Sequence, residues 1–323
     1  MPANLTPEYM AADRKFKAAV TPQDKLAALE EMLATIPKHK GTEKMQADIK
    51  RRIARLRNEA QRQRGASRGK PFYHVDKEGA GQIALVGAPN TGKSALLAAL
   101  TNAAPEVADY PFTTRVPLPG MMTYENVQVQ LVDLPPITPD LTEPWLYAII
   151  RTADAVLLVA DLAADDLLEQ TEQVLALLAQ ANIQLVGQVR EKNQKPAILV
   201  ANKLDAHGAG DRLALLREFI GSRLPVLPVS AQVETGLETL REAGFRLLGV
   251  IRVYSKPPGK KADMSAPFIL PGGSTVLDAA EAVHKDLREK IRYARLWGRQ
   301  GFQGQMVGRD HVLADGDVIE IHA

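Results

Sequence analysis

The segment Gly87–Ser94, GAPNTGKS, has the residue types and spacing of a loop that binds phosphate groups. Its glycines would let the backbone direct N–H donors at phosphate oxygens. The Lys93 ammonium would neutralise the β- and γ-phosphates of a nucleotide, and the Ser94 hydroxyl would ligate Mg²⁺. The alternative is a structural turn, but the apolar strand before the segment and the helical ALLAAL behind it favour the phosphate site. We therefore expect the phosphates to contact Gly87, Asn90, Thr91, Gly92, Lys93, Ser94 and Ala95.

A second segment, Asn202–Asp205 (NKLD), ends a later apolar run and could recognise a purine base. The N1–H and N2–H₂ donors of guanine match the two oxygens of Asp205, whereas adenine presents an acceptor that a carboxylate repels. Leaving a buried carboxylate unpaired costs a few kcal/mol, which is enough for strong discrimination. Taken alone, the tetrapeptide is usually a solvated turn, but behind a phosphate loop it predicts guanine specificity.

Three further residue roles follow from this assignment. Asn202 would tie the base-binding segment to the phosphate loop, and the aliphatic part of Lys203 would cover the purine face. Ser230 and Ala231 end the next apolar run, so their backbone N–H groups could donate to guanine O6.

Between residues 82 and 231, short apolar runs alternate with helical stretches. Several runs are continuously apolar, as in strands that helices cover on both faces. This alternation predicts an α/β domain with a doubly wound, largely parallel sheet. The strands are expected at 83–87, 127–134, 155–162, 197–205 and 225–231, and the clearest helices at 167–180 and 212–220.

Two smaller regions flank this domain. Apolar residues have helical spacing over 7–36 and 42–60, and the Pro/Gly break between them predicts an antiparallel helical hairpin. After residue 248, short strands surround one helix expected at 276–290, which predicts a small mixed β/α unit. We therefore expect three domains, at 1–70, 71–247 and 248–323.

Composition excludes several classes of protein. Of the 323 residues, 46% are hydrophobic and 24% are charged, as in globular proteins, and the absence of cysteine excludes disulfides, thiolate zinc sites and iron–sulfur clusters. No apolar run could span a bilayer and the N-terminus lacks a signal-peptide pattern, so we expect a cytoplasmic protein without a membrane span. The net charge of +2 conceals an asymmetry: residues 37–70 carry 12 basic and 3 acidic side chains, and residues 71–244 carry 12 and 21.

The chain resembles the Obg-like branch of the translation-factor-related GTPases, and within it the developmentally regulated GTP-binding (DRG) proteins. The segment 109–114 (DYPFTT) resembles switch I of that branch, and 133–135 (DLP) resembles switch II. The segments 269–286, 293–298 (YARLWG) and 307–313 (VGRDHVL) resemble a TGS domain, which is a β-grasp module. The resemblance implies a P-loop GTPase domain with a doubly wound sheet, preceded by the α-helical hairpin and followed by a small β-grasp (TGS) domain.

The resemblance also implies roles for single residues. Thr114 would reach Mg²⁺ and the γ-phosphate, unless it is only a strand residue, and Asp133 would hold the metal through water. The catalytic groups would then be Lys93 and Thr114, and no residue is assigned as general base. Asn90 resembles the K⁺ ligand of cation-stimulated GTPases, and capping of the loop is the alternative role for it.

Two residues at switch II bear on catalysis. Pro136 stands where the family has glycine, and proline lacks the N–H that the glycine donates to the γ-phosphate, a hydrogen bond worth about 1.5–3 kcal/mol. Ile137 stands where Ras-type enzymes orient water with glutamine, although the Obg-like branch shares a hydrophobic residue there. We expect slow hydrolysis of GTP to GDP and phosphate. The alternatives are a hydrolysis-impaired, nucleotide-stabilised RNA- or protein-binding adaptor and an ATPase, which Asp205 disfavours.

Basic residues in both flanking regions could contact RNA. Such charge is more often a solvated helix face, but it is concentrated in one helix and hinge, and TGS domains resemble modules that contact RNA and the ribosome. Binding of anionic membranes is disfavoured because the apolar stripe is narrow and lacks bulky aromatic residues. We expect the ribosome or structured RNA as partner, and also consider an accessory protein. The RNA contacts would be salt-dependent and come from Lys50, Arg51, Arg55, Lys260 and Lys261.

Overall fold

The computed structural model describes residues 73–101, 116–140, 142–188, 191, 193–298, 301 and 303–322, and nearer the N-terminus residues 9, 12, 15–16, 22–36 and 49. The chain forms two compact units, Met1–Phe72 and Tyr73–Ala323. The predicted switch I with Thr114 lies outside the described residues, as do Lys50, Arg51 and Arg55. The domain boundaries expected at 70 and 247 stay predictions.

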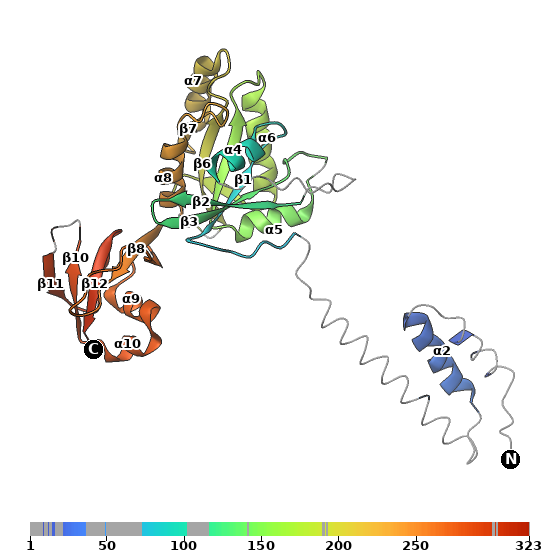
Figure 1. Ribbon diagram of the computed structural model, residues 1–323. Helices are drawn as coiled ribbons and strands as arrows, with labels where there is room; N and C mark the ends of the chain where they lie inside the picture. The colour runs from blue at the N-terminus through green and yellow to red at the C-terminus, as the bar shows by residue number, and fades with distance from the viewer. Residues whose placement is uncertain are drawn as a thin grey trace. The chain divides into compact units, whose positions relative to one another are not determined.

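The first unit contains the helix α2 (Pro22–Thr35) (Figure 1). Its buried residues recur at spacings of three and four, which places them on one helical face. They belong to an apolar cluster of Tyr9, Ala12, Leu29, Met32, Ile36 and Ile49. The expected second helix over 42–60 lies, except for Ile49, outside the described residues.

The second unit is built on a seven-stranded sheet in the order β2-β3-β1-β4-β6-β5, with β7 also paired to β6. All of these pairings are parallel except the one between β2 and β3, so the predicted doubly wound, largely parallel sheet is confirmed. The strands are β1 (Gln82–Val86), β2 (Leu118–Tyr124), β3 (Val127–Asp133), β4 (Ala155–Asp161), β5 (Gln184–Val186), β6 (Gln194–Asn202) and β7 (Val226–Pro228).

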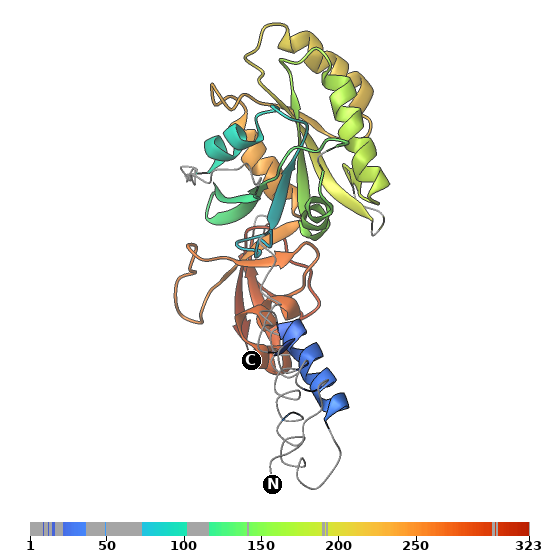
Figure 2. The same ribbon diagram turned by 90° about the vertical axis from the view of Figure 1, so that its right-hand side faces the viewer.

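Helices cover both faces of this sheet, because alternate residues of each central strand enter different apolar clusters. In β1, Ala84 and Val86 belong to one cluster, and Ile83 and Leu85 belong to the other. Figure 2 shows α4 and α8 on one side of the sheet and α6 on the other. The helices are α4 (Lys93–Leu100), α5 (Pro144–Thr152), α6 (Leu167–Gln180), α7 (Ala209–Ile220) and α8 (Leu237–Leu247). This layering brings the loops that follow β1, β4 and β6 to one edge of the sheet.

The C-terminal part is a five-stranded sheet in the order β11-β10-β12-β8-β9, with helices on one face. The single helix expected at 276–290 is two helices, because His284 adopts extended backbone with φ −163°. The elements are β8 (Val250–Ser255), β9 (Phe268–Pro271), α9 (Val276–Val283), α10 (Lys285–Lys290), β10 (Tyr293–Trp297), β11 (Gln303–Val307) and β12 (Asp317–His322). The predicted small mixed β/α arrangement is present.

The turn between β2 and β3 contacts this C-terminal sheet. Arg252 of β8 is buried, forms an ion pair with Asp315 at 2.7 Å and also pairs with Glu125 of the turn. Beside it, Asn126 Nδ2 donates to the Tyr254 hydroxyl at 2.8 Å. The hairpin that precedes Asp133 is therefore tied to the C-terminal sheet by side chains.

No helix in the part of the chain that the structure describes is long and apolar enough to cross a membrane.

Candidate nucleotide-binding site

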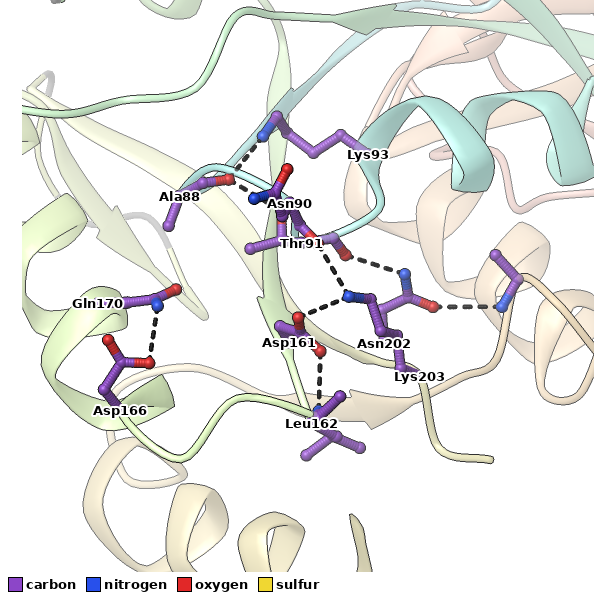
Figure 3. Close-up of polar contacts among 12 residues, drawn as sticks. Ala88, Asn90, Thr91, Lys93, Asp161, Leu162, Asp166, Gln170, Asn202 and Lys203 are labelled. Atoms are coloured by element: carbon purple, nitrogen blue, oxygen red, sulfur yellow. Dashed lines mark hydrogen bonds and ion pairs between the residues drawn. The ribbon is translucent and has the colours of Figure 1, made fainter. Parts of the chain in front are cut away.

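The predicted phosphate loop connects the end of β1 to the start of α4 (Figure 3). Asn90 and Gly92 have left-handed backbone, with φ values of 62° and 84°. A Cβ atom at Gly92 would lie 2.5 Å from Asn202 Nδ2, and one at Gly87 would lie 2.4 Å from the Val159 carbonyl oxygen. Glycine is therefore required at both positions, because the loop backbone packs directly against β4 and the base-binding segment.

The side chain of Lys93 folds back against the backbone of this loop. Its side chain is buried, and Nζ donates to the carbonyl oxygens of Gly87 at 3.2 Å and Ala88 at 2.8 Å. The loop borders an open pocket of about 520 Å³, whose lining also includes Asn90, Gly92, Ser94, Ala95, Asp133 and Pro136. The structure thus brings most of the predicted phosphate-contacting residues to one cavity, with a positive charge at its wall.

Ser94 and Asp133 form the oxygen-rich part of the pocket. The Ser94 hydroxyl donates to Asp133 Oδ2, whereas the buried Asp133 Oδ1 has no hydrogen-bond partner among the described residues. Burial raises the pKa of Asp133, and the Ser94 hydrogen bond and the charge of Lys93 oppose this shift. A hydroxyl beside a carboxylate with one free oxygen is a donor set that suits Mg²⁺, so these residues fit the metal that the sequence predicts.

The NKLD segment, which the sequence predicts to bind the base, lies against the phosphate loop. Asn202 is buried, and its Nδ2 donates to the Thr91 carbonyl oxygen at 3.0 Å (Figure 3). Lys203 has left-handed backbone with φ 65°, and its Nζ donates to the Asn90 carbonyl oxygen at 2.9 Å. The side chains of Asn202 and Lys203 therefore connect the NKLD segment to carbonyl groups of the loop. This is the connection that the sequence predicts for Asn202.

Asp205 is oriented by a residue for which the sequence suggested only a backbone role. The hydroxyl of the fully buried Ser230 donates to Asp205 Oδ1. The Ser230 N–H donates to the Thr235 carbonyl oxygen at 3.0 Å, and the Ala231 N–H donates to Asn202 Oδ1 at 3.2 Å. The Ser230 and Ala231 N–H groups, which the sequence predicts to donate to guanine O6, thus already donate to oxygen atoms of the protein. To reach guanine, either N–H group would have to donate to both oxygens or give up its present hydrogen bond.

Comparison with known proteins places this site in a family. Residues 82–203 match the family described as 50S ribosome-binding GTPase, and residues 251–323 match the TGS domain. A GTP-binding protein of Methanocaldococcus jannaschii is 31% identical over 361 residues, covering 93% of this chain and 92% of the relative. The developmentally regulated GTP-binding protein 1 of Xenopus laevis is 29% identical, covering 92% and 98%. The chain belongs to the DRG family.

DRG-family membership makes this chain a GTP-binding protein with a GTPase domain followed by a TGS domain, as the sequence resemblance predicted. Among solved structures, the Schizosaccharomyces pombe YchF GTPase matches with a TM-score of 0.56 and 13% identity, covering 78% of this chain and 100% of that one. At this identity the match supports the fold alone, and it confirms the predicted P-loop GTPase architecture.

The segment predicted as switch II contacts the phosphate loop through its backbone. The Ile137 N–H donates to the Gly87 carbonyl oxygen at 3.1 Å, and the Ile137 side chain is buried in the apolar core, 1% exposed. Pro136 lines the pocket and has no N–H to offer. The position used by glutamine in Ras-type enzymes therefore directs its side chain into the core.

The other residues predicted to have a function do not line the nucleotide pocket in the part of the chain that the structure describes. Lys260 and Lys261 are exposed in the loop between β8 and β9. Sequence reasoning missed two groups at the site: the Ser230 hydroxyl and Asp161, which forms an ion pair with Lys203. The only signal for Asp161 was its place at the end of an apolar run, the same signal that marks the NKLD segment.

Proposed function

We propose that this DRG-family protein is a slow GTPase that hydrolyses GTP to GDP and phosphate with Mg²⁺. The observation that carries the proposal is the joining of the phosphate loop to the base-binding segment, through Asn202 to Thr91 and through Lys203 to Asn90. A phosphate loop next to a segment that ends in a carboxylate suits a guanine nucleotide.

The proposed roles follow from the chemistry of each side chain. Lys93 would neutralise the β- and γ-phosphates, and Ser94 and Asp133, with Thr114 of switch I, would hold Mg²⁺. When bound, the metal would supply positive charge that offsets the charge of the phosphates. Asp205 would accept the two guanine donors, with one of its oxygens also held by Ser230.

Two features of switch II support slow hydrolysis. Pro136 lacks the N–H expected to bond the γ-phosphate, and the buried Ile137 side chain has no group that could orient water. No general base is assigned. Asn90, which lines the pocket, would hold K⁺ as an additional positive charge or serve only as a cap.

Phosphate release tests the proposal. The full chain should release phosphate from GTP and not from ATP, and EDTA should stop the reaction. Absence of release from GTP would contradict GTPase activity. Replacing NaCl by KCl should raise turnover if Asn90 is a K⁺ ligand, and equal rates in the two salts would assign it to the cap.

We further propose that the protein binds the ribosome or structured RNA in a nucleotide-dependent way in the cytoplasm. The support is the basic segment 37–70, the exposed Lys260 and Lys261, and the description of the GTPase family matched by residues 82–203 as ribosome-binding. In this proposal the domains are residues 1–70, 71–247 and 248–323. The basic residues that would contact RNA lie in the first and third of them. An accessory protein could share this task.

Sedimentation with ribosomes tests the partner. Binding should differ between a GTP analogue, GDP and no nucleotide, and it should weaken steeply as salt rises, because phosphate contacts release counterions. Absence from the ribosome pellet in all three nucleotide states would remove this part of the proposal.

Pro136 favours a second candidate, a nucleotide-stabilised adaptor with impaired hydrolysis. Pro136→Gly should restore the missing donor and raise turnover about ten-fold or more, since the hydrogen bond is worth about 1.5–3 kcal/mol. Measurable turnover that Pro136→Gly leaves unchanged would show that the proline does not impair the switch and would remove the basis of the adaptor candidate.

A further inference from the structure

We propose that Asp161 is a positioning residue for the guanine base and acts through Lys203. The inference rests on the proposed nucleotide site and extends it, because Asp161 belongs neither to the phosphate loop nor to the NKLD segment. It ends β4, which lies between β1 and β6 in the sheet. The phosphate loop follows β1 and the NKLD segment ends β6, so the end of β4 lies between them (Figure 3).

Both carboxylate oxygens of Asp161 are engaged. Oδ2 accepts from Lys203 Nζ at 2.6 Å, and Oδ1 accepts from the Ala163 N–H at 2.8 Å. The side chain of Asp161 is only 11% exposed, so the carboxylate end of the ion pair is shielded from water, whereas the Lys203 side chain is 36% exposed. The Ala163 hydrogen bond fixes the direction of the carboxylate, and one oxygen therefore faces the ammonium.

Lys203 is consequently fixed at both ends. Its backbone is held in the left-handed region, and its Nζ lies between the Asp161 carboxylate and the Asn90 carbonyl oxygen. Its four-carbon stem thus runs from the base-binding segment to the phosphate loop. A lysine held in this way loses less rotamer freedom when a purine packs against the stem. The side chain is 36% exposed, so without the carboxylate the ammonium could turn into solvent.

Removing the negative charge of Asp161 should change the nucleotide affinity in opposite directions, depending on whether Asp161 acts by electrostatic repulsion or by positioning Lys203. A carboxylate near the phosphates repels them, so its loss should strengthen nucleotide binding if charge alone mattered. If Asp161 positions Lys203, its loss should weaken binding. Asp161→Asn separates the two, because the amide keeps the size of the side chain and can still accept from Ala163.

The test is a titration of the full chain with Mg²⁺ and GDP, for the wild type, Asp161→Asn, Lys203→Met and the double variant. Asp161→Asn should bind GDP about ten-fold more weakly than the wild type, and it should cause no further loss in the Lys203→Met background. Asp165→Asn is the matched control, because this fully exposed carboxylate on the same loop pairs with Arg212 and carries the same charge. It should leave GDP affinity unchanged.

Asp161→Ser, which can accept from Ala163 but is too short to reach Lys203, is the second variant and should lose as much affinity as Asp161→Asn. Unchanged or tighter GDP binding by both variants would overturn the inference. An equal loss in the presence and absence of the Lys203 ammonium would also overturn it, since Asp161 would then act independently of Lys203. Failure of the wild type to bind GDP would overturn the proposed site itself, which distinguishes the two claims.

Discussion

At the scale of single residues, the Asp205 carboxylate, which we propose recognises the base, is oriented by the protein itself. The fully buried Ser230 hydroxyl donates to Asp205 Oδ1. A carboxylate oxygen can accept more than one hydrogen bond, so both oxygens can still receive donors from guanine. Asp205 is therefore held in one direction and keeps its capacity for the base.

Asp205→Asn should change the base preference from guanine, which has an amino group at position 2, to xanthine, which has an oxygen there. The amide would set its NH₂ group against the guanine 2-amino group, and GDP affinity should fall about 10- to 100-fold. Xanthine carries an oxygen at that position, so xanthosine diphosphate should bind the variant better than GDP does. Isothermal titration checks both affinities. The exposed Asp211→Asn serves as control, and a variant that still preferred GDP would contradict the assigned role.

Motif residues at the site could be predicted from the sequence, but their supporting residues could not. The functional residues of the phosphate loop and of NKLD are contiguous in the sequence, so each motif can be recognised directly. Asp161 and Ser230 lie 42 and 25 residues from their partners, so their contacts depend on the order of strands in the sheet. In the sequence, only its place at the end of an apolar run separates Asp161 from the nearby Asp165 and Asp166, which are exposed.

At the scale of elements, the continuously apolar strands were predictable because burial on both faces leaves a clear pattern. The antiparallel strand β2 was missed, because it contains Pro119 and Gly120, which ordinarily break strands. Both are tolerated here: β2 is an edge strand, and a Cβ at Gly120 would lie 3.0 Å from Leu97 of α4. The sequence also gave no signal for the break at His284, whose ring accepts from the Asp286 N–H and caps α10.

The start of α9 offers a test of local stability. The Thr275 hydroxyl accepts from the Asp278 N–H, and Asp278 accepts from the Thr275 N–H at 2.8 Å, which is a capping box. Thr275→Ala should lower the free energy of unfolding by about 1 kcal/mol, measured by urea denaturation. Thr275→Ser keeps the hydroxyl and should lose little, and an equal loss in the two variants would contradict the cap.

The same cap has a pH dependence of definite sign. Hydrogen bonds from the Thr275 backbone and side chain lower the pKa of Asp278 in the folded state. A lowered folded pKa contributes stability above the unfolded pKa, and that contribution is lost as pH falls through the folded pKa. The difference in unfolding free energy between the wild type and Asp278→Asn should therefore shrink in the acid range below the ordinary pKa of 3.8. A difference that stayed constant there would contradict it.

At the scale of the whole molecule, the GTPase domain and the TGS domain share a polar contact around Arg252. Its guanidinium pairs with Asp315 and Glu125 and lies 5.1 Å from the centroid of the Phe245 ring. Glu125 belongs to the β2–β3 turn, and β3 ends at Asp133 of the proposed metal site. One hairpin thus reaches both the nucleotide pocket and the TGS sheet.

Arg252→Met should destabilise the protein by about 1.5–3 kcal/mol, because the buried guanidinium loses its charge-assisted hydrogen bonds to two partly exposed carboxylates. Arg252→Lys should recover only part of this, since lysine lacks the planar fork that contacts Asp315 through two nitrogens. The exposed Arg246→Met on α8 is the control and should change stability by about 0.5 kcal/mol or less. Chemical denaturation measures all three, and equal losses for Arg252→Met and Arg246→Met would contradict the contact.

The measurement that most directly tests the account is a competition between GDP and ADP for the purified full-length protein with Mg²⁺. Because Asp205 matches the donors of guanine and repels the adenine acceptor, GDP should bind about 100-fold more tightly or better. Equal affinities, or tighter binding of ADP, would contradict the claim that the NKLD segment reads a guanine base beside the phosphate loop.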